Sequence, residues 1–158
     1  MSVITYLGDE LCFMAIALLF FWCINKRQAY FIFAVGLAGS IVNQFLKLWF
    51  RIPRPWVIDP DFTIVESARE AASGYSFPSG HTQNAVGTFG AIAINSKEKW
   101  IRVVCVLLML IVPFSRMYLG VHTPLDVAVS MLVAAVLISL FYPMFKSDEQ
   151  IYKKTLII

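Results

Sequence analysis

Three short segments of the chain carry side chains that can bind and transfer a phosphoryl group. They supply cations, imidazoles, a carboxylate and a glycine turn at Lys47 and Arg54, at Ser79, Gly80 and His81, and at Arg116, His122 and Asp126. Phosphoryl transfer needs fixed donors for the charge on several oxygens. Arginine meets this need because its planar fork binds two oxygens at once, whereas lysine acts as a point charge. The three segments together therefore predict one phosphate site.

The first segment is expected at the end of a helix. Lys47 and Arg54 lie seven positions apart, which is about two turns if the helix continues. Pro53 and Pro55 disfavour helix there, so we expect Arg54 just past the helix end. A simpler interpretation is that Lys47, Arg51 and Arg54 extend to the membrane surface as long cationic side chains. Taken alone, the segment favours that simpler interpretation.

The second segment, Pro78-Ser79-Gly80-His81, precedes a helical stretch. Ser79 is a suitable N-cap, and Gly80 allows backbone N–H groups to approach an anion at the helix N-terminus. His81 would project from the first turn beside the bound phosphate. We expect it to act as the general acid that gives a proton to the departing alkoxide. For an isolated histidine, the favoured alternative is a residue at the membrane interface on a capped helix.

The third segment combines a histidine with a carboxylate one helical turn away. Thr123 and Pro124 have the types of an N-cap and a first helical residue, so Asp126 falls in the first turn, close to His122. A carboxylate on one ring nitrogen fixes the tautomer and leaves the other nitrogen free to attack. We expect His122 to be the nucleophile, forming a phosphohistidine, and Asp126 to orient it. Compensation of the helix dipole by Asp126 is an alternative that is compatible with this role.

Apolar helices must position these residues. The 158 residues are 59% hydrophobic and 15% charged, and the mean hydropathy is +0.72. Soluble domains have about 45–50% apolar and about 25% charged residues. The excess predicts an integral membrane protein, because a small soluble domain has too little interior for so many apolar side chains.

Five apolar segments approach the length of about 20 residues that spans a bilayer. They cover residues 7–24, 30–50, 79–95, 101–119 and 124–145. The third is rich in Gly, Ala and Thr, which predicts close packing against other helices. No segment shows sustained alternation with a period of two. The expected fold class is all-α: a polytopic membrane bundle of about five transmembrane helices, forming a single domain over residues 1–158.

The basic residues predict an orientation. If the five spans alternate, eight basic residues lie at one end: Lys26, Arg27, Lys97, Lys99, Arg102, Lys146, Lys153 and Lys154. Lysine and arginine favour cytoplasmic loops. The phosphate site at the other end is therefore expected to face the extracytoplasmic side, in a protein of the cell membrane.

One long polar connection, residues 55–78, separates the first two segments of the expected site. A connection of this length is usually functional or disordered. We expect a lid over the site or a passage for the substrate, and a plain surface connection is the alternative. Thr63 to Ala72 has the composition of a short helix that Gly74 would end.

Other classes of site find little support in the sequence. The three cysteines, Cys12, Cys23 and Cys105, lie within apolar stretches and have no partner at metal-ligand spacing. We expect them to be buried or lipid-facing, and we expect no metal and no cofactor. The net charge of +3 comes from basic residues that form no continuous run. Nucleic acid is therefore not an expected partner.

The three segments, with the patterns K-x6-R-P, P-S-G-H and S-R-x5-H-x3-D, resemble the signature of the type 2 phosphatidic acid phosphatase (PAP2) superfamily. The match runs from Lys47 to Asp126, about half of the chain. The resemblance implies a PAP2/haloperoxidase-like helical core. It also implies metal-independent hydrolysis through a phosphohistidine. In the family pattern, the phosphate-binding positions correspond to Lys47, Arg54, Ser79, Gly80 and Arg116, and the acid, nucleophile and orienting positions to His81, His122 and Asp126.

Members of this family commonly have a core of six spans, so the five segments here suggest that the first span is missing. Family members act on phosphatidic acid, phosphatidylglycerol phosphate, undecaprenyl diphosphate and sphingoid phosphates, and some act on glucose 6-phosphate. We therefore expect an integral-membrane phosphatase for a lipid phosphate or diphosphate. A phosphatase for a soluble sugar phosphate and a catalytically silent lipid-binding protein are the alternatives. The sequence does not identify the substrate or the oligomeric state.

Overall fold

The computed structural model describes residues 2–59, 61–65, 68–69, 72 and 74–147. Within these ranges the chain is helical and contains no strand, which confirms the expected all-α class. The helices are α1 (Ser2–Thr5), α2 (Glu10–Leu19), α3 (Lys26–Phe50), α4 (Pro55–Ile58), α6 (Gly80–Asn95), α7 (Lys99–Tyr118) and α8 (Pro124–Ser147). A 3-10 turn, η1 (Tyr6–Gly8), joins α1 to α2, and a π-helical turn, η2 (Phe20–Ile24), extends α2. The five predicted apolar segments correspond to α2 with η2, α3, α6, α7 and α8.

Local signals explain where several helices begin and end. Asp9, Asn25 and Ser79 each accept a hydrogen bond from a backbone N–H in the first turn of α2, α3 and α6. The predicted N-cap at Ser79 is therefore confirmed. Helix α3 ends where Arg51 adopts a left-handed conformation with φ of 50°. Arg54 lies past this end, as the flanking prolines predict.

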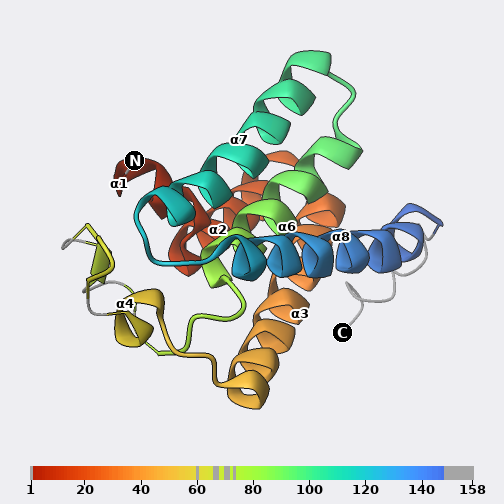
Figure 1. Cartoon of the computed structure of the whole chain (residues 1–158). Coiled ribbons are helices and arrows are strands. Elements are labelled where there is room, and N and C mark those ends of the chain that lie inside the picture. The colour runs from red at the N-terminus through yellow and green to blue at the C-terminus, as the bar shows by residue number, and fades with distance from the viewer. Residues whose placement is uncertain (1, 60, 66–67, 70–71, 73, 148–158) are drawn as a thin grey trace.

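Helix α6 forms the centre of the bundle and packs against α3, α7 and α8 (Figure 1). Its small residues permit this close packing. A Cβ atom added at Gly90 would lie 2.5 Å from Ile138 Cδ1 on α8, and one added at Gly87 would lie 3.2 Å from Val35 Cγ1 on α3. The composition of this segment thus indicated a helix surrounded by protein.

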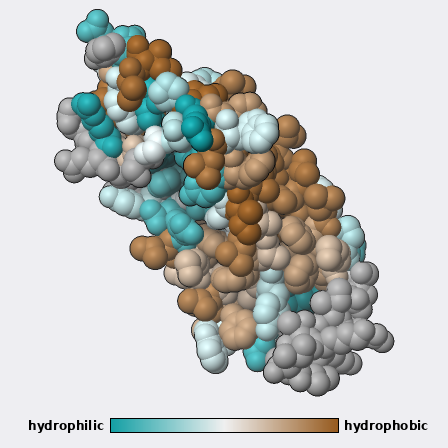
Figure 2. All heavy atoms as spheres, turned by 90° about the horizontal axis from the view of Figure 1, so that it is seen from below, coloured by the Kyte–Doolittle hydropathy of each residue, from teal (hydrophilic) through white to brown (hydrophobic). Residues whose placement is uncertain are grey.

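Within the described residues, three stretches are long and apolar enough to cross a membrane: Lys26–Ile58, Lys99–Tyr118 and Pro124–Lys146. Glu10–Ile24 is a shorter apolar helix, and α6 has 16 residues. Large apolar side chains on α7 and α8 are exposed, including Leu107, Leu110, Phe114, Leu132 and Leu140. Figure 2 shows apolar side chains over the middle of one face and hydrophilic ones gathered toward an end. The protein is an integral membrane protein. Helix α6 is shorter than the three long stretches, and many of its side chains are buried by the helices packed around it.

The basic helix ends meet at one end of the bundle. A surface pocket there is lined by Asn25 and Arg27 at the start of α3, Asn95 at the end of α6 and Lys146 near the end of α8. Lys153 and Lys154 lie outside the described residues. The segments expected to form the phosphate site lie at the opposite ends of these same helices.

Candidate active site

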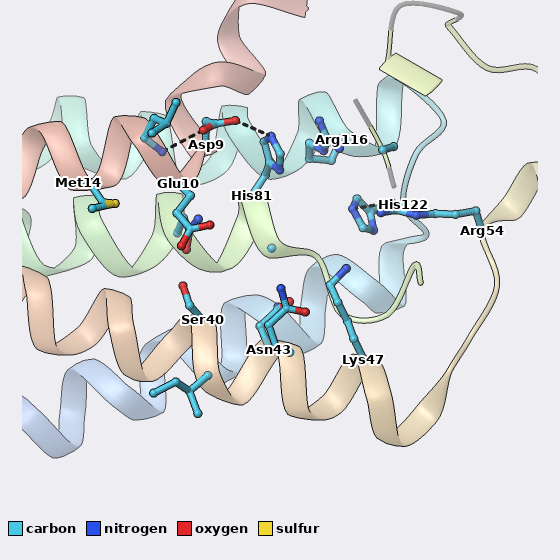
Figure 3. A pocket seen from close by; sticks show the side chains of 16 residues that line it. Asp9, Glu10, Met14, Ser40, Asn43, Lys47, Arg54, His81, Arg116 and His122 are labelled. Carbon is cyan, nitrogen blue, oxygen red and sulfur yellow. Dashed lines mark hydrogen bonds and ion pairs between the residues drawn. The ribbon is translucent and has the colours of Figure 1, made fainter. Parts of the chain in front are cut away.

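The three predicted segments meet where α3 and α7 end and where α6 and α8 begin. A pocket of about 770 Å³ opens there (Figure 3). Six of the eight candidate residues line it: Lys47, Arg54, Gly80, His81, Arg116 and His122. Ser79 and Asp126 are buried behind the pocket wall. The structure thus brings all eight candidates to one place.

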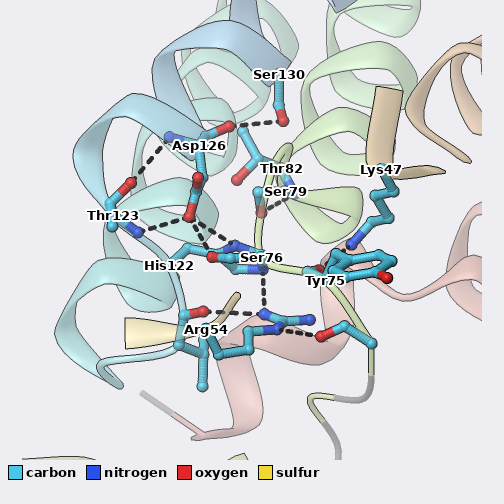
Figure 4. A network of polar contacts seen from close by, with 12 residues as sticks. Lys47, Arg54, Tyr75, Ser76, Ser79, Thr82, His122, Thr123, Asp126 and Ser130 are labelled. Carbon is cyan, nitrogen blue, oxygen red and sulfur yellow. Dashed lines mark hydrogen bonds and ion pairs between the residues drawn. The ribbon is translucent and has the colours of Figure 1, made fainter. Parts of the chain in front are cut away.

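His122 is held by Asp126 through one ring nitrogen. His122 Nδ1 lies 3.3 Å from Asp126 Oδ2, so the neutral ring donates its Nδ1 proton to the carboxylate. The same oxygen accepts hydrogen bonds from Ser76 Oγ at 2.5 Å and from the backbone N–H of Thr123 at 2.9 Å (Figure 4). The other nitrogen, His122 Nε2, lies 3.1 Å from Arg54 Nη1. Because arginine only donates, Nε2 is unprotonated and its lone pair faces Arg54, which lines the pocket with it.

Burial keeps this imidazole neutral. Desolvation is the main cause that lowers the pKa of His122 to about 3, and the Arg54 and Arg116 guanidinium groups lower it further. The hydrogen bond and charge of Asp126 oppose this shift without cancelling it. At neutral pH the unprotonated Nε2 is thus available as a nucleophile.

Arg54 and Lys47 are held by backbone carbonyls of the connection that follows α4. Arg54 Nε donates to Gly74 O at 3.2 Å, and Lys47 Nζ donates to Tyr75 O at 2.8 Å. Arg54 Nη1 also donates to Val121 O at 2.9 Å. The expected lid thus contacts two cations of the site. Of the short helix expected over residues 63–72, Thr63 to Val65 are not helical and residues 68–69 are, while 66–67 and 70–71 lie outside the described residues.

Arg116 is a buried cation with an unsatisfied donor. It is 2% exposed, and its Nη1 donates to Thr5 Oγ1 at 2.7 Å. Its Nε has no hydrogen-bond partner among the described residues. A buried guanidinium group is costly unless it is paired, so a donor left over beside the pocket favours an anion there.

The turn before α6 is open toward the pocket. Ser79 Oγ accepts from the backbone N–H of Thr82 at 3.4 Å, which starts the helix. Among the described parts of the chain, a Cβ atom added at Gly80 would have one neighbour within 4 Å, Asn43 Oδ1 at 3.8 Å. The first N–H groups of a helix lack intrahelical acceptors. With Gly80 unhindered on its pocket side, they can bind an anion.

His81 stands at the rim of the pocket, with its ring between Asp9 and Arg116 (Figure 3). Its Nε2 lies 3.9 Å from Asp9 Oδ2. Sequence reasoning missed three residues that contact the site: Thr5, Asp9 and Ser76. Thr5 and Ser76 have no signal in the sequence. Asp9 had one, since an aspartate before an apolar stretch predicts an N-cap, but that signal does not indicate a neighbour on α6.

Metal ligands and thiols do not gather at this site. Over the described ranges, no three histidine, cysteine or acidic side chains are placed to hold a metal ion. The three cysteines are free, with Cys105 buried and Cys23 exposed on the π-helical turn. The expectation of chemistry without a metal stays a prediction.

The geometry of three cations, two imidazoles and a capped helix agrees with a comparison of the whole chain with known families. A family model described as the PAP2 superfamily matches residues 27–149. The chain belongs to the PAP2 superfamily. The family predicted from the three segments is therefore confirmed.

Two relatives of this PAP2 protein are named as phosphatases. Undecaprenyl-diphosphatase BcrC of Bacillus subtilis (strain 168) is 33% identical over 132 residues, which cover 81% of this chain and 65% of that protein. Phosphatidylglycerophosphatase B of Escherichia coli (strain K12) is 26% identical over 162 residues, which cover 76% and 63%. The chain thus spans less than two thirds of the length of these relatives.

A solved structure shares the fold. It is the first transmembrane PAP2 type phosphatidylglycerolphosphate phosphatase from Bacillus subtilis, with a TM-score of 0.74 and 25% identity. The likeness covers 94% of this chain and 76% of that one. The membrane bundle of this PAP2 protein is therefore the family fold.

Proposed function

We propose that this PAP2 protein hydrolyses a lipid phosphate or diphosphate at the membrane surface. One observation carries the proposal. His122, whose ring is fixed by the hydrogen bond to Asp126 at 3.3 Å, lines a pocket together with three cations between apolar helices. A neutral nucleophile in a cationic pocket suits attack on an anionic phosphoryl group.

In the first half of the reaction, His122 Nε2 attacks phosphorus and the bond from phosphorus to the leaving oxygen breaks. His81 gives that oxygen its proton, while Asp126 stabilises the positive imidazole of the phosphohistidine. In the second half, a water molecule attacks the phosphorus and His81 takes the water's proton. The P–N bond breaks, inorganic phosphate leaves, and both histidines regain their starting states.

The cations stabilise the charge that develops on the transferred group. Arg54 and Arg116 each offer a planar fork of donors, and Lys47 adds a point charge. The N–H groups at the start of α6 add neutral donors on another side. We assign binding of the phosphoryl oxygens to these groups, with Ser79 and Gly80 shaping the turn that presents the N–H groups.

A lipid substrate is supported by the walls of the pocket and by the names of the relatives. Leu11 and Met14 on α2 and Ile41 on α3 line the same pocket as the cations. Leu11 and Ile41 are also largely exposed on the surface. A substrate can therefore keep its apolar chain among apolar side chains while its phosphate reaches His122. The relatives are named for undecaprenyl diphosphate and phosphatidylglycerol phosphate, and both of these molecules join a phosphate group to apolar chains.

We assign the site to the extracytoplasmic side of the cell membrane, because the described basic helix ends lie at the opposite end of the bundle. We also assign residues 55–78 as a lid, on the strength of the carbonyls of Gly74 and Tyr75 that hold Arg54 and Lys47. Phosphate oxygens would compete with these carbonyls for the same donors, so binding and loop position are coupled.

A substrate panel tests the activity. Purified protein in detergent is given phosphatidic acid, phosphatidylglycerol phosphate, undecaprenyl diphosphate and glucose 6-phosphate, and released phosphate is measured. We expect release from at least one lipid and none from a folded His122→Ala variant. Preference for glucose 6-phosphate would support the soluble-substrate alternative. Equal release by His122→Ala, or no release by folded wild type, would contradict the proposal.

A further inference from the structure

The proposed general acid, His81, has more cations than anions around its ring. Arg116, Arg54 and Lys47 are the cations that act on its ring, from the end of α7, the segment before α4 and the end of α3. Among the residues that the structure describes, Asp9 is the one anion that acts on it. Glu10 lines the same pocket at the start of α2 but does not act on His81 in this way. Burial is the main cause that opposes a charged imidazole here, and the three cations add to it. A proton donor in this position therefore needs a nearby anion.

The carboxylate of Asp9 is held so that it faces His81. Its Oδ1 accepts a hydrogen bond from the backbone N–H of Leu11 at 2.9 Å and thereby caps α2. Its Oδ2 lies 3.9 Å from His81 Nε2. One oxygen therefore starts the helix while the other faces the imidazole. The cap fixes the carboxylate, so its orientation does not depend on the protonation of His81.

Backbone packing fixes the separation of the two residues. Gly8, which directly precedes Asp9, lies against the backbone of His81, and a Cβ atom added there would lie 2.5 Å from His81 O. Close contact of the η1 turn with the first turn of α6 thus sets where Asp9 stands. Thr5, at the end of α1, makes a parallel contact by accepting from Arg116 at 2.7 Å.

We propose that Asp9 is a positioning residue that orients the ring of His81 and favours its protonated form for its role as proton donor. This inference rests on the proposed function, because it assigns a partner to the general acid of that reaction. Asp9 touches no reacting atom. In the first half of the reaction the proton moves from His81 to the leaving oxygen, and in the second half it returns from water, while Asp9 exchanges no proton in either half.

The test uses Asp9→Asn, which removes the charge and keeps a good N-cap, since asparagine and aspartate cap helices about equally well. Glu10→Gln is the matched control, because it removes a neighbouring carboxylate from the same pocket. Two substrates with the same alkyl chain are compared: an alkyl phosphate, whose leaving alkoxide needs a proton, and an alkyl-substituted nitrophenyl phosphate, whose leaving phenoxide does not. Full-length protein in detergent is used throughout.

We expect Asp9→Asn to lower kcat for the alkyl phosphate on the order of tenfold or more, within the range of general acid catalysis, and to change kcat for the nitrophenyl phosphate by less than about threefold. The alkaline limb of its pH profile for the alkyl phosphate should move to lower pH. Asp9→Glu should recover part of the loss. Glu10→Gln should leave kcat for both substrates within about twofold of wild type.

Three results would overturn the inference. They are unchanged kcat in Asp9→Asn, an equal loss with both substrates, and the same selective loss in Glu10→Gln. A thermal melt of each variant separates misfolding from the selective effect, since misfolding lowers both activities together. His122→Ala is assayed in parallel: if it stays active, the proposed function fails, whereas an inactive His122→Ala beside an unaffected Asp9→Asn rejects only the role of Asp9.

Discussion

Asp126 connects the proposed nucleophile to the protein around it. Its Oδ2 accepts from Ser76 and Thr123 and lies against His122 Nδ1. The carboxylate thus joins the loop before α6 to the start of α8 and selects the tautomer that leaves Nε2 unprotonated. Asp126 Oδ2 therefore both stabilises the packing of these segments and orients the proposed nucleophile.

Replacement of Asp126 by Asn should separate these two effects. The amide keeps the shape but cannot accept all of these protons, so kcat should fall by about 10²–10⁴ and stability by about 1–3 kcal/mol. Phosphate release and thermal melting measure the two losses. Ser130→Ala is the control, since Ser130 Oγ bonds only the backbone oxygen of Asp126 at 2.9 Å. A full-activity Asp126→Asn protein would contradict the orienting role.

Arg116 offers a test of phosphate binding. Vanadate resembles a phosphoryl group in transfer, and we expect it to inhibit by occupying the pocket. Arg116→Lys keeps the charge and loses the planar fork, so the inhibition constant should rise about tenfold, equivalent to ~1.4 kcal/mol. Arg102→Lys, near the start of α7 at the other end of the bundle, is the matched control. An unchanged inhibition constant in Arg116→Lys would remove Arg116 from the phosphate-binding set.

His122 should make the fold sensitive to acid. Its pKa is about 3 in the folded protein, against about 6.5 in an unfolded chain. Between these values the unfolded state binds the proton and the folded state does not, so stability falls as pH drops from about 6.5 toward 3. The melting temperature of wild type should therefore fall more between pH 7 and pH 4.5 than that of His122→Gln. Equal falls would show that His122 is not buried as a neutral ring.

At the scale of the elements, α2 packs against α3 through an aromatic ring. A Cβ atom added at Gly36 would overlap the ring of Phe13, which is 2% exposed and belongs to the main apolar core. Gly36→Ala should therefore destabilise the protein by about 1–3 kcal/mol. The double variant Gly36→Ala with Phe13→Leu makes room for the methyl group and should recover part of this loss. Thermal melting decides, and a Gly36→Ala protein as stable as wild type would contradict the packing.

Some of the helices could be predicted from the sequence and others could not. Caps and prolines located the helix ends at Ser79 and before Arg54, and apolar length located the five main helices. The short α1 and η1 were not predicted, because so few residues give no period to detect. Thr5 and Asp9 were missed for the same reason: their neighbours Arg116 and His81 are distant in sequence, and only the packing of η1 on α6 brings them close.

At the scale of the whole molecule, the cations of the candidate site lie at one end of the bundle, and the remaining basic helix ends lie at the opposite end. The eight candidate residues could be chosen from the sequence because their types match a demanding chemistry. Their convergence could not be derived from spacing alone, since it depends on α6 lying at the centre of the bundle. Small residues such as Gly87 and Gly90 permit the central position of α6. The composition of the segment indicated close packing but did not identify the helices that pack against it.

The basic helix ends, which lie at the end opposite the pocket, predict the side of the membrane on which the pocket opens. In sealed right-side-out membrane vesicles, vanadate added outside should inhibit hydrolysis as strongly as it does in detergent, because the proposed orientation places the mouth of the pocket outside. Inside-out vesicles should resist the same concentration until detergent is added. The reverse pattern would contradict the orientation drawn from the basic helix ends.

The location of the pocket at one end of the bundle also fixes where the cleaved ion goes. In the proposed reaction, the water that resolves the phosphohistidine enters through the mouth of the pocket lined by His122, and the freed orthophosphate leaves by the same opening. Each turnover therefore deposits phosphorus in the compartment that the mouth faces. With the proposed extracytoplasmic orientation, a cell that reuses this phosphate must import it again, so turnover at this site is coupled to uptake across the bilayer.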